Sequence, residues 1–162
     1  MRLQLCAAVF LLVPQVSLAQ APSGCEQAAF ASAVSDASAV LSSMNDQNKK
    51  AFQAKLIALK TREGWTDNDY AAKATPFVKD ATTAAFDDGN KTLLEKVPQL
   101  GGTAEAGAIP AMDAARRCAM LEELRGLMAR VVENTRAKWT HMLGKLDSAL
   151  DVSRQAKAAA GQ

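Results

Sequence analysis

The chain has 162 residues, 49% of them hydrophobic, and a formal net charge of +2 at pH 7. This length suits one domain that buries about two thirds of the surface exposed by its unfolded chain. The near-neutral charge, without a basic block, argues against nucleic-acid binding. Aromatic residues make up 5% of the chain, and no long segment alternates apolar with polar residues. We therefore expect an all-α protein.

Residues 1–19 have the features of a secretory signal peptide. Arg2 provides a basic start, residues 3–13 form an apolar run, and small residues precede the expected cleavage point. The apolar run is too short for a permanent membrane span. We therefore expect a periplasmic or secreted chain without stable membrane insertion. Its residues 20–162 would fold as a single helical domain, with 157–162 as a frayed tail.

Two cysteines, Cys25 and Cys118, remain once Cys6 leaves with the signal peptide. An exported protein with a single pair of cysteines usually joins them, and no CxxC motif suggests a redox-active pair. We therefore predict a structural disulfide, worth about 4–5 kcal/mol in the chain-entropy description. Small residues before Cys25 also suit lipid modification, but Pro22 stands where an aliphatic residue is expected.

The first part of the mature chain repeats apolar residues at helical spacing. These residues are Phe30, Val34, Ala37, Leu41 and Met44. We expect a helix from about residue 23 to 44, a turn at residues 45–46, and a second helix at 47–63. Gly64 then provides a C-terminal stop.

A strong start signal follows Gly64. Thr66 and Asp69 have the spacing of a capping box, and Trp65 and Tyr70 have that of a hydrophobic staple. A helix should therefore begin at Asp67.

The rest of the central region contains several breaks. Pro76 either kinks the helix or lies in the first turn of a new helix capped by Thr75. We further expect a turn at 87–90, a short helix at 91–97 ended by Pro98, and a loop at 100–108.

Residues 110–157 predict one long amphipathic helix that starts at Pro110. Its apolar stripe consists of Leu121, Leu124, Met128, Val131, Thr135, Trp139, Met142, Leu146 and Ala149. Gly126 and Gly144 interrupt the sequence as close-packing points or, at Gly144, as a hinge. Together the segments predict an all-α bundle of four to five helices, in which the disulfide makes the first and last helices parallel.

The predicted last helix extends beyond the first. If the two run side by side from the cysteines, Met44 lies level with about residue 137. The apolar residues beyond this point would then form an exposed patch, which marks a partner site. They are Trp139, Met142, Leu146 and Leu150, with Arg136, Lys138 and Lys145 as a polar rim.

The candidate chemistry is sparse. His141 is the only histidine, and with a methionine (Met44, Met120, Met128 or Met142) it offers a haem or copper ligand pair. Methionines at helical spacing more often fill a core. Four aspartates, Asp67, Asp69, Asp87 and Asp88, lack the EF-hand pattern, and capping and turns explain them. We see no phosphate-binding loop, catalytic elbow or zinc motif, so we predict no catalytic residue, no metal site and no enzyme.

The sequence thus favours an exported helical bundle that binds a protein partner or its own copy. The alternative is a small-ligand or cofactor carrier with His141 and a methionine as anchors. An enzymatic hypothesis would need clustered carboxylates with shifted pKa values in a cleft.

Overall fold

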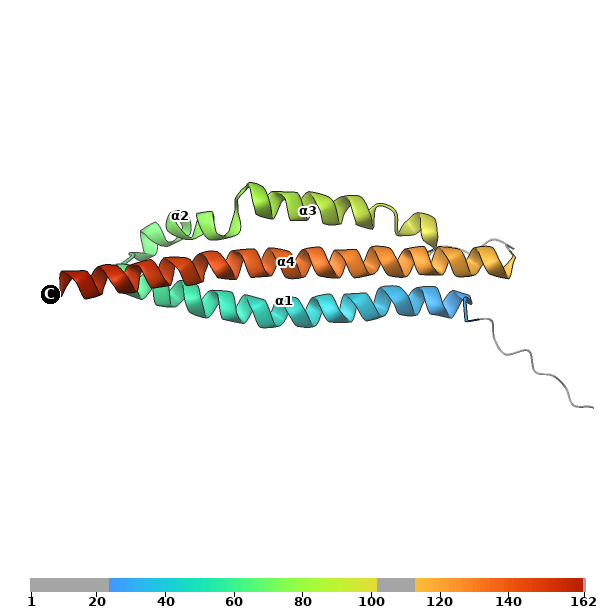
Figure 1. Ribbon diagram of the computed structural model, residues 1–162, viewed down its shortest axis with the longest axis horizontal. Helices are drawn as coiled ribbons and strands as arrows, with labels where there is room; N and C mark the ends of the chain where they lie inside the picture. Colours follow the sequence, from blue (N-terminus) through green and yellow to red (C-terminus); the bar gives the residue numbers. More distant parts are fainter. Residues whose placement is uncertain (1–23, 102–112, 162) are drawn as a thin grey trace, which may run out of the picture.

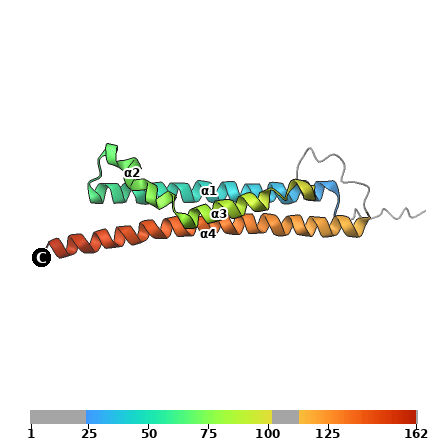
Figure 2. The same ribbon diagram turned by 90° about the horizontal axis from the view of Figure 1, so that it is seen from above.

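The computed structural model describes residues 24–101 and 113–161, and its regular elements are all helices (Figure 1). They are α1 (Gln27–Glu63), α2 (Asp67–Val78), α3 (Ala81–Leu94), the 3₁₀ helix η1 (Pro98–Leu100) and α4 (Ala114–Ala160). The two long helices α1 and α4 run side by side in the same direction, and α2 and α3 return along them (Figures 1 and 2). The predicted all-α bundle with a long C-terminal helix is confirmed.

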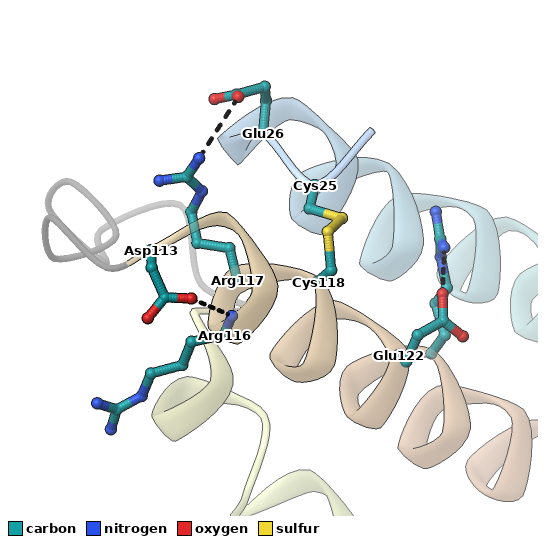
Figure 3. The surroundings of a disulfide bond; sticks show 8 residues. Cys25, Glu26, Asp113, Arg116, Arg117, Cys118 and Glu122 are labelled. Atoms are coloured by element: carbon teal, nitrogen blue, oxygen red, sulfur yellow. Dashed lines mark hydrogen bonds and ion pairs between the residues drawn. A yellow bond between two sulfur atoms is a disulfide. The ribbon is translucent and has the colours of Figure 1, made fainter. Parts of the chain in front are cut away.

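The disulfide closes the end of the bundle where both long helices begin (Figure 3). Cys25 and Cys118 are bonded, with their α-carbons 5.0 Å apart. Next to them, Glu26 and Arg117 form a long ion pair at 3.9 Å. The predicted pairing and the parallel direction of the first and last helices are therefore both confirmed.

α4 begins later than expected. Asp113 has an extended backbone and caps the helix, because its carboxylate accepts from the Arg116 amide at 2.9 Å. Pro110, the predicted start, lies outside the described residues. At the other end the helix continues to Ala160, so residues 157–160 of the predicted frayed tail are helical, although exposed.

The predicted turn at residues 45–46 is wrong, because α1 is one uninterrupted helix of 37 residues. Asn45 uses its side chain for a tertiary contact, accepting a 2.8 Å hydrogen bond from Trp139 Nε1. α1 ends where predicted, at Gly64, whose φ of 65° lies in the left-handed region that favours glycine.

The start of α2 is as predicted, with a reciprocal capping box between Thr66 and Asp69. Of the two alternatives for Pro76, a new helix capped by Thr75 is wrong, because α2 continues through both residues. The proline lies inside α2, near its end, where its missing amide removes one helical hydrogen bond.

The break between α2 and α3 comes later, at Lys79 and Asp80. Asp80 caps α3 in a second capping box, accepting from the Thr83 amide at 2.7 Å. This box satisfies backbone donors that the first turn of a helix leaves unpaired.

Residues 87–90, predicted as a turn, are also helical, since α3 continues through them to Leu94. Asp87 forms an ion pair with Lys138 at 2.6 Å, and Asn90 donates to Thr135 Oγ1 at 3.1 Å. The predicted short helix at 91–97 is therefore wrong as well: its first residues belong to α3, and η1 follows it. Gly101 ends η1, and the rest of the predicted loop lies outside the described residues.

The core divides into two clusters along the bundle. The near cluster, beside the disulfide, contains Phe30, Val97, Leu121, Leu124 and Met128. The distal cluster contains Phe52, Leu56, Leu59, Met142 and Leu146. Among the described helices, none has an apolar stretch long enough to cross a membrane.

Candidate functional site at the distal end

The four residues predicted as a partner site all belong to the distal cluster. Met142 and Leu146 are 6% and 0% exposed, and the half-buried Trp139 and Leu150 pack beside them. The expectation of an overhanging patch is wrong, because α1 accompanies α4 almost to its end. Arg62, near the end of α1, donates to the Leu150 carbonyl at 2.6 Å.

The three cations predicted as a polar rim are each paired within the chain. Arg136 pairs with Glu133 on the same helix, and Lys138 pairs with Asp87. Lys145 bonds Asp80. Lys138 therefore connects α4 to α3, and Lys145 connects it to the break between α2 and α3.

Asp80 is the centre of a polar cluster at the α2–α3 break. Its Oδ2 accepts from Lys145 Nζ at 2.5 Å and lies 2.8 Å from His141 Nε2, while Oδ1 accepts from the Thr83 amide. Lys145 also donates to the Pro76 carbonyl. The Lys145 ammonium, and after it His141 and the Thr83 amide, hold the pKa of Asp80 far below its ordinary value of 3.8.

This cluster does not form a nucleophile and base pair. Ser148 lies seven residues from His141 along α4, which is about 10.5 Å and beyond hydrogen-bond reach. Thr140 uses its hydroxyl to donate to the Arg136 carbonyl at 3.0 Å. Asp80 is surrounded by donors, so the arrangement serves as a joint between the helix break and α4.

The methionines proposed as ligand partners of His141 lie elsewhere. Met142 faces the distal cluster, whereas Met128 belongs to the near cluster, about 20 Å along α4. Met120 packs against the near cluster, and Met44 is half-buried in α1. Across residues 24–101 and 113–161, no group of three or more His, Cys, Asp or Glu residues is arranged to hold a metal ion.

The aspartates considered for calcium have other contacts. A hydrogen bond from Lys60 lowers the pKa of Asp67, and one from Thr66 lowers that of Asp69. Asp87 pairs with Lys138. The predicted capping role is correct for Asp69 alone, since Asp67 is the first residue of α2 rather than a cap.

The sequence did not reveal an open apolar hollow of about 470 Å³ where α1, α2 and α4 meet. Trp65 and Phe77 form its aromatic wall, and the exposed Val152 forms its outer edge, with 66% of its surface accessible. Leu59, Ala149 and Ser153 line its base beside the distal cluster. The only sequence signal was the valine itself, one turn beyond Ala149 at the end of the predicted stripe.

A second hollow of about 540 Å³ adjoins the first and shares Phe77 and Ser148 with it. It is lined by Lys145 and His141 from the Asp80 cluster. The two hollows therefore form one surface, which has an aromatic apolar part and a polar part.

Comparison with known proteins adds nothing to this geometry. No family model matches the chain, and no curated protein or solved structure is significantly similar to it. The candidate site rests on the contacts, burial and charges described above.

Proposed function

We propose that this protein is exported and acts by non-covalent binding of a partner protein at the distal end of the bundle. The observation that carries the proposal is the apolar hollow bounded by Trp65, Phe77 and Val152. Export is supported by the N-terminal sequence pattern together with a cysteine pair at bonding distance.

The shape of the hollow favours a protein over a small molecule. Small-ligand sites usually enclose 70–90% of the ligand surface, whereas this hollow is open on its outer side. An open apolar depression with an aromatic wall suits one inserted side chain of a partner, surrounded by polar contacts. Glu63 and Ser148 provide such a polar edge.

The distal cluster beneath the hollow also supports partner binding. Leu59 lines the hollow and belongs, with Leu146, to the buried distal cluster, in which the two are 2% and 0% exposed. The hollow thus lies over a packed core and is already open in the folded chain, so it needs no large rearrangement before binding.

The proposal is tested by native mass spectrometry of protein isolated from the exporting cells. Val152→Asp places a charge on the apolar edge, and Leu94→Asp is the matched control on α3, where the leucine is 45% exposed. We expect the wild type and Leu94→Asp to carry the same additional protein mass, and Val152→Asp to lose it.

Equal spectra for all three proteins would contradict the proposal. A wild type found only at its own mass, or at multiples of it, would contradict it as well. The same spectra give the mass of the chain, and a mass that still includes residues 1–19 would contradict cleavage of the predicted signal peptide.

A further inference from the structure

A second feature lies on the side of α4 opposite to α3. Lys138 contacts α3, and Ala129 lies nine residues before it, which is two and a half turns and therefore the opposite side of the helix. Here α1 and α4 border a groove of about 430 Å³. Its lining includes Ala33, Ala37, Val40, Met128, Ala129 and Val132. Val40 is 47% exposed, so the groove has apolar surface that its own chain leaves open.

The charges beside this groove have an unusual arrangement around Ala129. Arg125 and Glu122 lie four and seven residues before it, and Glu133 and Arg136 lie four and seven residues after it. These spacings place all four on one stripe of α4. Their side chains are 50–72% exposed. At equal distances from Ala129, the two directions along the helix carry opposite charges.

We propose that two copies of this chain pair through this groove, with their α4 helices antiparallel and a two-fold axis at Ala129. The rotation sets Arg125 opposite Glu133 of the second copy, and Glu122 opposite its Arg136. Every acid of the stripe then faces a base. In a parallel pairing, each charged residue would instead face the same residue of the second copy, so like charges would meet.

An acidic residue of α1 lies at the level of the proposed axis. Asp36 lines the groove on α1 and lies 93 residues before Ala129, the separation that also joins Cys25 to Cys118. It is therefore level with Ala129.

The axis also brings Val132 to the level of Gly126 of the second copy. A β-carbon on Gly126 would meet no atom within 4 Å in its own chain. The glycine thus leaves the surface of α4 without a side chain at this level. Small residues at a helix crossing let the two helices approach closely.

This pairing does not depend on the proposed function, because it uses another face of the molecule. It has a consequence for that function. Val152 lies 23 residues from the axis, so the two distal hollows of the dimer would be about 70 Å apart, at opposite ends. A dimer of this form would bind two partners at once.

The test uses variants that change the symmetry of the charges and keep their sum. Within one chain, Glu122 pairs with Arg125 at 2.8 Å, and Glu133 pairs with Arg136. Glu122→Arg with Arg125→Glu exchanges the first pair, and Glu133→Arg with Arg136→Glu exchanges the second. Each exchange keeps an ion pair on the helix, so the fold is preserved, but like charges now face each other across the axis.

We expect sedimentation velocity to show a wild-type dimer. Each single-pair exchange should raise the dissociation constant at least about tenfold. An equimolar mixture of the two exchanged proteins should form a mixed dimer, and the protein with both exchanges should dimerise like the wild type. A monomeric wild type would overturn the proposal, as would single-pair exchanges that dimerise normally, provided that circular dichroism shows an unchanged fold.

A cysteine on the axis gives a second test. Ala129→Cys places two thiols face to face, within the 7 Å α-carbon separation that a disulfide needs. Ala84→Cys, at an exposed alanine of α3, is the matched control. We expect mild oxidation to link Ala129→Cys into a covalent dimer and to leave Ala84→Cys monomeric. Equal linking of both variants, or of neither, would overturn the proposed axis.

Discussion

The two ends of the bundle are closed by different forces. At the near end, a covalent bond between Cys25 and Cys118 joins the starts of α1 and α4. At the distal end, hydrogen bonds and ion pairs join them, including Lys55 with Asp147 and Arg62 with the Leu150 carbonyl. Exposed ion pairs contribute little, so the distal end depends mainly on its apolar cluster. The stronger closure lies far from the candidate site.

This difference suits a protein that binds at one end. The disulfide fixes the register of α1 against α4 for the whole length of the bundle. The distal end can then carry an open hollow without losing its alignment. Local opening should also begin there, since the disulfide ties α1 to α4 only at the other end.

The largest effect should come from removing the covalent closure. Replacing Cys25 and Cys118 by serine should lower the free energy of unfolding by about 4–5 kcal/mol in the chain-entropy description. Urea unfolding of the oxidised protein and of the double variant measures this difference. A loss below about 1 kcal/mol would mean that side chains alone hold the near end.

Truncation of the distal core should have the next largest effect. Leu146→Ala removes a side chain that is 0% exposed and should cost about 2–5 kcal/mol. Val152→Ala, at the exposed edge of the hollow, should change stability by less than about 0.5 kcal/mol. Thermal unfolding of both variants distinguishes the packed base from the open edge, and equal losses would contradict that distinction.

The polar joint at Asp80 should give a pH-dependent effect. Its pKa is lowered in the folded protein, so its contribution is complete above the ordinary value of 3.8 and is lost as the pH falls towards the folded pKa. Asp80→Asn should therefore melt below the wild type at pH 7, and the gap should narrow below about pH 4.

Asp88→Asn, at an exposed aspartate of the same helix, is the control and should melt with the wild type throughout. A gap for Asp80→Asn that stays constant from pH 7 to pH 3 would show that its carboxylate charge is not what stabilises the joint.

The smallest effect should be a gain. Gly144 is exposed in the middle of α4, and a β-carbon there would meet no atom within 4 Å. Gly144→Ala should therefore stabilise the helix by about 0.5–1 kcal/mol. A higher melting temperature with unchanged partner binding would argue against a hinge at this position, and a lower one would contradict the prediction.

Features with a local physical cause could be predicted from the sequence. Residue spacing predicted the period of α4, the capping box at Thr66 and Asp69, and the stop at Gly64. The cysteine pairing was predicted from the expected export of the chain. The parallel direction of α1 and α4 then followed from the disulfide. These signals need no knowledge of distant contacts.

The two wrongly predicted turns share one cause. Asn45, Asp87 and Asn90 are residue types that favour turns, but in the folded chain each side chain contacts α4. Tertiary contacts thus override their local preference. Since the turn at 45–46 was the premise for the exposed patch, this one error placed buried residues such as Leu146 at a partner site.

The near end of the bundle is closed covalently, and the distal end is closed by side chains. Amide hydrogen exchange along the chain, measured before and after selective reduction of the disulfide, tests this claim most directly. We expect reduction to remove more protection from the starts of α1 and α4, around Phe30 and Leu121, than from the distal segments around Leu56 and Leu146. Equal loss along both long helices, or no loss beside the cysteines, would contradict it.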